Sequence, residues 1–385
     1  MSSPPHIVHI TTHLGRGGAA KNVLLSCIGL ARNGFRVSLL SGPSSNGETK
    51  LIEEAICEGV QIVEIPHLGR EVHPFRDYFA LRKIRAALTR DRPSIVHTHQ
   101  SKAGLLGRWA ARGTGDLPVV HSPHGHVFYG YFPGWKTKIF EALERKGASW
   151  CDLLIGLTQK EIDDHLERGI GRQGQWRVIP SGVDLELVRG QAEKPSPVRE
   201  SLHIAEDAFL FASLGRLEPV KGIVPFLEIF SLALRKVDNV HWVILGEGGE
   251  GSEIEAGIEK HDLAGKVHLV GWRDEPYSWL AACDALLLPS RNEGMGRSIV
   301  EALALGLPVF AADVGSVPEI INDPRLGQLF LWSDTKGAVE KLCGFIGEQP
   351  RFAEGAEERK RVASGYSLEV MIERTVSLYE ELLSS

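Results

Sequence analysis

The sequence contains few cysteines and no cysteine pair. Its five cysteines are scattered over 385 residues, and none belongs to a Cys-x-x-Cys motif. A disulfide framework and a cysteine-bound zinc site are therefore not expected, and the composition suits a reducing compartment.

Long apolar runs are also missing. The longest uncharged apolar stretch, residues 302–312, lies between Glu301 and Asp313 and is interrupted by a glycine and a proline, so it is too short to span a bilayer. The segment before His6 leaves no room for the charged and apolar regions of a secretory signal. We therefore expect a cytoplasmic protein.

The first half of the sequence has no excess of acidic residues. Residues 1–185 hold 23 Lys and Arg against 17 Asp and Glu, whereas the remainder holds 20 against 32. A basic first half favours contact with an anionic partner, such as lipid phosphates at the inner face of the cytoplasmic membrane. The alternative is an uneven surface charge without a function. No nucleic-acid partner is expected.

Short β-branched runs alternate with helical patterns along the chain. The first series of strands is expected at 7–12, 36–41, 60–65, 94–98, 118–122, 152–157 and 176–180. The second series is expected at 209–214, 241–245, 267–271, 285–289 and 308–312. Such alternation predicts an α/β protein with two Rossmann-like, doubly wound parallel sheets. Ligands bind such sheets beyond the carboxyl ends of the strands, so two facing units would share one cleft.

A polar, proline-containing stretch over 188–207 marks the expected domain boundary. We predict an N-terminal domain over 1–187 and a C-terminal domain over 188–366. The amphipathic segment 367–385 is expected to form a helix that packs back on the first domain.

Glycines follow the first predicted strand as Gly15-Arg-Gly17-Gly18, before a helix. Backbone N–H groups in such a loop can approach an anion at the positive end of the helix. A tight turn without a ligand is the alternative interpretation.

A dinucleotide-binding dehydrogenase is a rival interpretation, because the first loop fits G-x-G-x-x-A and Gly246–Gly251 fits G-x-G-x-x-G. After the first loop, the second strand ends without the acid that would hold a ribose. In the second loop, Glu247 and Glu250 would repel a pyrophosphate, although Asp274 follows the next strand at a somewhat long distance.

A more specific signal is a pair of glutamates, Glu293 and Glu301, in a strand-loop-helix segment over 289–309. The N–H groups around 294–298 can bind an anion between them. A helix-stabilising acid and a solvated helix face form the structural alternative.

Two cations, Arg216 and Lys221, follow the first strand of the second series. Strand ends of one sheet share an edge, so these cations and the Glu293 loop can converge. A diphosphate leaving group needs such neutralisation. Because the sequence has no Asp-x-Asp pair, we expect fixed cations rather than a metal, and no cofactor.

Ordered motifs over nearly the whole chain resemble family 4 glycosyltransferases of the GT-B fold. The motifs are Gly15–Gly18, His124-Gly125, Ile179-Pro-Ser-Gly-Val-Asp184, Gly215-Arg216 through Lys221-Gly222, Leu245-Gly-Glu-Gly248 and the Glu293/Glu301 pair. The resemblance implies a hexosyltransferase that uses a nucleotide diphosphate sugar, here favoured as a UDP-sugar, as substrate.

The resemblance also implies roles for individual residues. The expected catalytic residues are Glu293, His124, Arg216 and Lys221. The expected donor-binding residues are Gly17, Gly18, Arg216, Lys221, Gly294, Met295, Gly296, Arg297 and Glu301. Glu301 would hold the ribose and Glu293 the donor sugar. His124 would contact the sugar, or else be a satisfied histidine at a strand end.

Two residues depart from the family pattern. Met295 replaces a common aromatic residue, and Arg297 replaces a common apolar one. Arg297 can read a carboxylate or phosphate, or point to solvent.

The family transfers sugars with retention of configuration. No second carboxylate is well marked as a nucleophile, so the resemblance implies same-face attack, with the departing phosphate oxygen accepting the acceptor's proton. Catalysis then rests on leaving-group stabilisation and positioning.

The acceptor is expected to be a lipid-linked or polyprenyl diphosphate glycan of surface-polysaccharide assembly. Aromatic and lysine residues over 127–140 and the cations of helix 75–92 suit a membrane interface. The alternative is that the aromatics pack internally and the cations are solvated. A sugar-nucleotide epimerase, an NAD-dependent oxidoreductase and a decayed, non-catalytic scaffold remain the competing functions.

Overall fold

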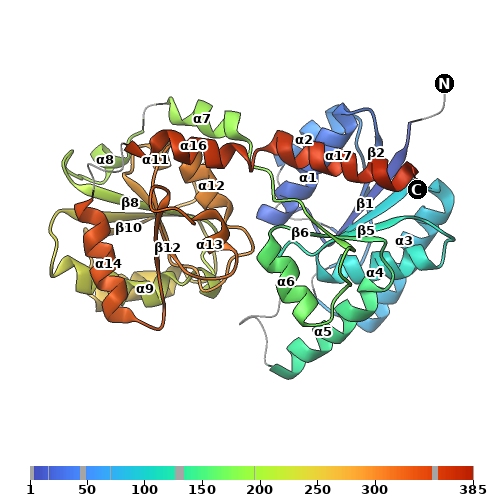
Figure 1. The fold of residues 1–385 in the computed structure, drawn as a ribbon, viewed down its shortest axis with the longest axis horizontal. Coiled ribbons are helices and arrows are strands. Elements are labelled where there is room, and N and C mark those ends of the chain that lie inside the picture. The colour runs from blue at the N-terminus through green and yellow to red at the C-terminus, as the bar shows by residue number, and fades with distance from the viewer. Residues whose placement is uncertain are drawn as a thin grey trace. The chain divides into compact units, whose positions relative to one another are not determined.

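The computed structural model describes residues 4–15, 17–43, 49–69, 71–125, 134–194, 196–348 and 354–384. The chain forms two compact units (Figure 1). The first contains Met1–Gly182 and Leu368–Ser385, and the second contains Val183–Ser367.

The first unit contains a seven-stranded sheet in which every pairing is parallel. Its order is β3-β2-β1-β4-β5-β6-β7. The strands are β1 (His6–Thr11), β2 (Arg36–Ser41), β3 (Gln61–Glu64), β4 (Ile95–His99), β5 (Val119–Ser122), β6 (Leu153–Gly156) and β7 (Trp176–Val178). β1 is buried along its whole length, as expected for a strand covered on both faces.

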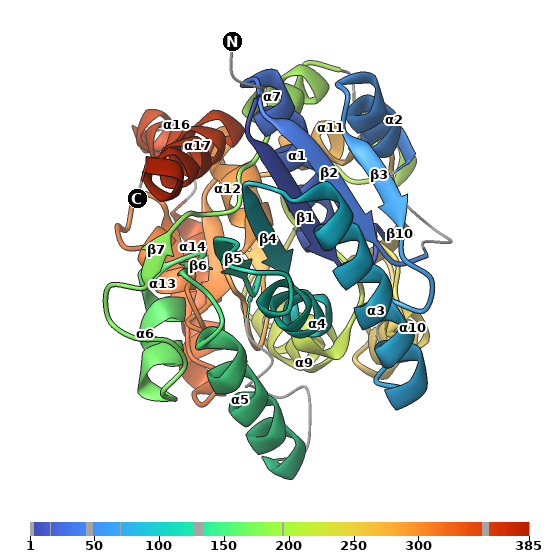
Figure 2. The same cartoon turned by 90° about the vertical axis from the view of Figure 1, so that its right-hand side faces the viewer.

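Helices cover both faces of this sheet (Figure 2). They are α1 (Gly18–Arg32), α2 (Thr49–Cys57), α3 (Pro74–Asp91), α4 (Ser101–Arg112), α5 (Gly134–Ala148), α6 (Gln159–Glu167) and α17 (Leu368–Ser384). α1 contacts α2 and α17, whereas α4 contacts α3 and α5. On α17, Ile372 reaches so close to α1 that a side chain at Gly29 would overlap it.

The second unit contains a six-stranded parallel sheet in the order β10-β9-β8-β11-β12-β13. The strands are β8 (Phe209–Leu214), β9 (Val240–Leu245), β10 (Val267–Gly271), β11 (Ala285–Leu288), β12 (Val309–Ala312) and β13 (Gly327–Phe330). The helices of this unit are α7 (Leu185–Ala192), α8 (Val198–Ser201), α9 (Ile223–Leu234), α10 (Gly251–Lys260), α11 (Pro276–Ala281), α12 (Arg297–Ala304), α13 (Val317–Ile320), α14 (Thr335–Gly347) and α16 (Ala356–Ser364), with the 3-10 turn η1 (Pro219–Lys221).

An aromatic core joins α9 and α14 to this second sheet. Trp242 is fully buried at its centre, and its indole N–H donates to Ser213 Oγ at 2.9 Å. The buried polar group is therefore satisfied, as a close-packed core requires.

The predicted α/β architecture with two parallel sheets is confirmed. The strand β13 was not expected, because its four residues begin with a glycine and include no β-branched residue. The chain crosses between the units at Gly182–Val183, a few residues before the predicted boundary. The polar stretch that suggested residue 187 lies partly within α7, which is capped by Asp184 and packs against α11 and α12.

Among the described residues, no helix has the length and apolar character needed to cross a bilayer.

Removing the hydroxyl of Tyr379 tests the attachment of α17. Tyr379 is fully buried, and its hydroxyl lies 2.5 Å from Nδ1 of buried His97. We expect Tyr379→Phe to lower the free energy of unfolding by about 1–3 kcal/mol, because it leaves a buried ring nitrogen unsatisfied. Tyr78→Phe, at a half-exposed tyrosine, is the matched control. Equal urea denaturation curves for the two variants would contradict this account.

Candidate functional site

The candidate site lies where the winding of the second sheet reverses. β8 and β11 are neighbours in the sheet. The strands that follow β8 in sequence, β9 and β10, lie on one side of this pair, and β12 and β13 lie on the other. Such a switch point opens a crevice at the carboxyl ends of the two strands. The loop after β8 carries Arg216 and Lys221, and the loop after β11 carries Glu293.

Close backbone contact joins these two loops. Gly222 has a φ of 66°, and a Cβ atom there would lie 2.1 Å from the carbonyl oxygen of Pro289. The N–H of Arg291 donates to the carbonyl of Val220 at 2.7 Å. Only glycine permits both the left-handed backbone and this approach, so Gly222 fixes the position of Lys221.

Lys221 and Glu293 form an ion pair at the centre of the site. Lys221 Nζ lies 2.6 Å from Glu293 Oε1, which also accepts a hydrogen bond from Ser290 Oγ at 2.7 Å. The Glu293 side chain is 10% exposed and that of Lys221 is 27% exposed. The pair is therefore shielded from most solvent, yet the ammonium group remains accessible to a ligand.

Glu293 is also held through its backbone. A Cβ atom on Gly315, which has a φ of 53°, would lie 2.2 Å from the Glu293 carbonyl oxygen. The loop after β12 therefore packs directly against the loop that carries the glutamate. Loops that follow β8, β11 and β12 therefore meet at Glu293.

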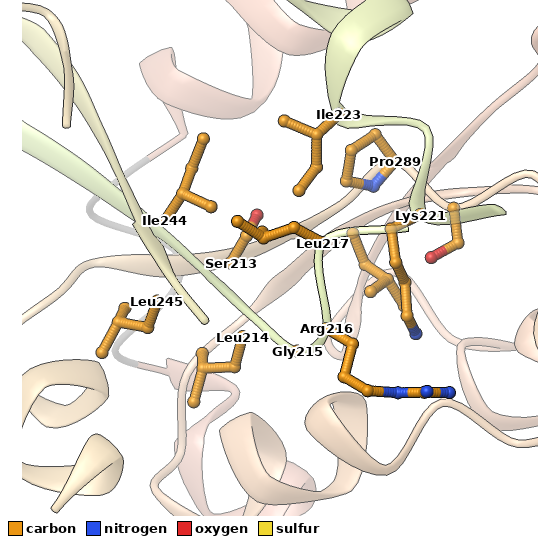
Figure 3. Close-up of a pocket in the computed structure, with 12 residues that line it drawn as sticks. Ser213, Leu214, Gly215, Arg216, Leu217, Lys221, Ile223, Ile244, Leu245 and Pro289 are labelled. Carbon is orange, nitrogen blue, oxygen red and sulfur yellow. The ribbon is translucent and has the colours of Figure 1, made fainter. Parts of the chain in front are cut away.

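Arg216 and Lys221 line one pocket at the ends of β8, β9 and β11. Figure 3 shows their side chains on the same side of this pocket. Arg216 pairs with Glu218 at 2.8 Å and is 45% exposed. An exposed ion pair of this kind is weak, so Arg216 can exchange Glu218 for an anionic ligand at little cost.

Glu301 lies on α12, and it is buried rather than solvated. Its Oε1 accepts a hydrogen bond from the hydroxyl of Tyr277 on α11 at 3.0 Å. Burial, and secondarily the charge of Glu301, raises the pKa of Tyr277, so the phenol remains a donor at neutral pH. The solvated-face alternative is therefore wrong for Glu301.

The loop between the glutamates consists of buried and partly buried residues. Gly296, with a φ of 75°, precedes the first turn of α12. Met295 is buried, so at this departure from the family pattern the side chain packs internally. Arg297 is partly buried, and its charge acts on the Tyr277 hydroxyl, which places it on the Glu301 side of the loop.

The glycines of 246–251 have a packing role. Cβ atoms on Gly246 and Gly248 would lie 1.8 and 2.2 Å from carbonyl oxygens of Gly215 and Leu217. The loop thus supports the backbone beside Arg216. This contact accounts for the first two glycines of the pattern without a bound dinucleotide.

The remaining predicted residues belong to the first unit. Gly17 precedes α1 at the carboxyl end of β1, next to the exposed Gly18. His124 follows β5 with a φ of 58°, a left-handed conformation that is uncommon outside glycine. Gly125 donates its N–H to Glu161 at 2.9 Å, which anchors this turn to α6. Within the predicted aromatic segment 127–140, residues 127–133 lie outside the described residues.

The structure brings Lys221 and Glu293 into direct contact and places Arg216 in the same pocket as Lys221. Sequence reasoning missed Ser290 and Tyr277. The Ser290-x-x-Glu293 spacing matches a capping-box pattern and could have indicated the serine, whereas Tyr277 carries no motif signal.

Two family profiles match the chain, one on each unit. "Glycosyltransferase Family 4" matches residues 16–187, and "Glycosyl transferases group 1" matches residues 196–359. The fold agrees with that of Anabaena HepE solved with UDP and glucose, with a TM-score of 0.79, 20% identity and coverage of 98% of this chain and 100% of that one.

Two curated relatives are similar over most of their length. The UDP-Gal:alpha-D-GlcNAc-diphosphoundecaprenol alpha-1,3-galactosyltransferase of Escherichia coli is 25% identical over 87% of this chain and 88% of its own. The capsular polysaccharide biosynthesis glycosyltransferase CapM of Staphylococcus aureus is 23% identical over 84% and 86%. The profile matches, taken with the two doubly wound units, establish that the chain belongs to glycosyltransferase family 4 and has the GT-B fold.

Proposed function

We propose that the protein transfers a sugar from a UDP-sugar to a lipid-linked glycan acceptor, with retention of configuration and without a metal. The observation that carries this proposal is the Lys221–Glu293 pair at the switch point of the second sheet. Its cation and carboxylate are the two charges that a diphosphate and a reacting sugar need side by side. The Escherichia coli relative, which is named for both UDP-Gal and a diphosphoundecaprenol acceptor, supports this choice of substrates.

The diphosphate of the donor is the ligand proposed for Arg216 and Lys221. Both line one pocket, and the positive end of α12 begins nearby at Arg297. Lys221 would turn from Glu293 toward the β-phosphate, while Ser290 keeps its hydrogen bond to Glu293. The carboxylate then faces the donor sugar, and Glu301, held by Tyr277, takes the ribose hydroxyls.

The proposed chemistry breaks the bond between the anomeric carbon and the β-phosphate oxygen. The acceptor oxygen bonds to the same face of that carbon, and its proton moves to the departing phosphate oxygen. Fixed cations stabilise the charge that develops on the leaving group. Gly17, Gly18 and His124, which follow strands of the first sheet, are the donor contacts proposed for the first unit.

A surface of the first unit is proposed to contact the cytoplasmic face of the membrane. Trp135, Ile139 and Leu143 recur every four residues along α5 and are 63%, 51% and 40% exposed; we name them the apolar stripe. Lys136 lies over the Trp135 ring at 5.5 Å. α3 adds exposed Phe75 beside its basic residues. Aromatic rings with lysines suit the boundary of an anionic bilayer.

Neutralising the ion pair tests the site. We expect Lys221→Met and Glu293→Gln each to reduce transfer by about 10²–10³-fold, because each removes a charge proposed to stabilise the transition state. The measurement is the initial rate with a panel of UDP-sugars and a polyprenyl-diphosphate-linked sugar. Lys236→Met, at an exposed lysine after α9, is the matched control. Rates above half of wild type in both site variants would refute the assignment.

Leaving out the acceptor separates transfer from epimerisation. A transferase consumes the donor slowly without acceptor, whereas an epimerase converts it at the full rate. Rapid acceptor-independent conversion would therefore overturn the proposed function.

Removing the apolar stripe tests the membrane surface. We expect Trp135→Ser combined with Ile139→Ser to weaken binding to phosphatidylglycerol vesicles at least about tenfold, because each buried apolar side chain contributes about 1.5–3 kcal/mol. Co-sedimentation measures the bound fraction. Trp272→Ser, at an exposed tryptophan of the second unit, is the control. Equal binding by both proteins would contradict a membrane role for α5.

A further inference from the structure

A cluster of buried histidines lies beneath His124 in the first unit. His9 on β1 and His97 and His99 on β4 are all nearly inaccessible, and their ring nitrogens come within 4.8 Å of one another. The proposed chemistry uses only His124. The other rings therefore need an explanation of their own.

Two of these rings, those of His9 and His99, form a hydrogen-bonded chain that ends at His124. His9 Nδ1 lies 2.8 Å from His99 Nε2, and His99 Nδ1 lies 2.8 Å from His124 Nε2. The planes of the His9 and His99 rings make an angle of 8°, and those of the His99 and His124 rings make an angle of 28°. In each contact one ring nitrogen must donate and the other must accept. The position of the proton on one ring therefore determines which nitrogen of the next ring is protonated.

The rings of this chain are neutral at physiological pH. Burial lowers the pKa of His9 to about 3 and that of His124 to about 4, and it lowers the pKa of His99 well below its usual range. A neutral imidazole carries one proton, on either Nδ1 or Nε2. The two hydrogen bonds can therefore both be donated toward His124 or both be donated toward His9.

The buried end of the chain selects the direction. His9 Nε2 is buried and has no hydrogen-bond partner among the described residues. An orphaned buried N–H is rarer than an orphaned acceptor, so the His9 proton belongs on Nδ1, where it donates to His99 Nε2. His99 then carries its proton on Nδ1 and donates to His124 Nε2.

We propose that His9 and His99 are positioning residues that hold His124 in the Nδ1–H tautomer, so that His124 donates a hydrogen bond to an oxygen of the bound sugar nucleotide. The identity of that ligand rests on the proposed function, whereas the tautomer does not. No described residue forms a hydrogen bond with His124 Nδ1, and the residue is only partly buried, so this N–H is available to a ligand.

The surrounding groups leave this direction unchanged. His97 is bonded to the hydroxyls of Tyr379 and Ser122, which can donate or accept. His121 is bonded to Thr98 on β4. A metal ion among His9, His97 and His99 would have to displace hydrogen bonds at both His97 and His99, so the hydrogen-bonded chain is the favoured arrangement.

Nitrogen NMR of the full-length protein measures the tautomer directly. Selective ¹⁵N labelling of the 15 histidines, with assignment from the spectrum of His124→Gln, distinguishes Nδ1–H from Nε2–H by the pattern of two-bond proton couplings. We expect the Nδ1–H tautomer for His124 in the wild-type protein. The Nε2–H tautomer would overturn the proposal, whatever the enzyme activity.

Two substitutions at His99 then separate positioning from packing. In His99→Asn the amide nitrogen takes the place of Nδ1 and keeps the donor to His124, whereas His99→Leu fills the volume without a donor. In His99→Leu we expect a mixture of His124 tautomers and a KM for the sugar-nucleotide donor that is about five- to tenfold higher. An increase of this size corresponds to the loss of one neutral hydrogen bond. His99→Asn should restore both the tautomer and the KM.

The control is His268→Leu, which breaks the only comparable contact in the described part of the second unit, that of His268 with His241 at 3.1 Å. An unchanged KM in His99→Leu, or an equal rise in His99→Leu and His99→Asn, would overturn the positioning role. If the wild-type protein transfers no sugar, the proposed function fails, and the NMR result still decides the tautomer.

Discussion

The ion pair between Lys221 and Glu293 is the interaction on which the candidate site depends. It joins the loops that leave β8 and β11, the two strands between which the winding of the second sheet reverses. Backbone contacts at Gly222 and Gly315 hold the backbone of both partners. Binding of a diphosphate therefore requires only that the Lys221 side chain turns from Glu293 toward the phosphate, and the rest of the site is preorganised.

The two sheets share the order of their first six strands but carry different side chains. At the carboxyl edge of the second sheet the side chains are charged, and glycines bring their loops together. At the edge of the first sheet the side chains are neutral histidines linked by hydrogen bonds. Charge suits a diphosphate, whereas a fixed neutral donor suits the hydroxyl groups of a sugar. This division supports the assignment of the diphosphate to the second unit.

The sequence predicted the sheets and the charged residues, because alternating strands and helices determine which loops share an edge. It also predicted the convergence of Lys221 and Glu293, which lie 72 positions apart. It did not predict the chain from His9 to His99, because residues 90 positions apart pair only through the order of strands in the sheet. Tyr277 was missed for a different reason: it lies on α11 and its partner Glu301 on α12, so no shared sheet edge indicates their contact.

Calorimetric titration of the wild-type protein with matched nucleoside monophosphates and diphosphates tests the central claim most directly. If Arg216 and Lys221 hold the β-phosphate, UDP must bind at least about tenfold more tightly than UMP, since hydrogen bonds to charged groups contribute about 1.5–3 kcal/mol. NAD must not compete. Equal affinities for UMP and UDP, or tight binding of NAD, would contradict the account.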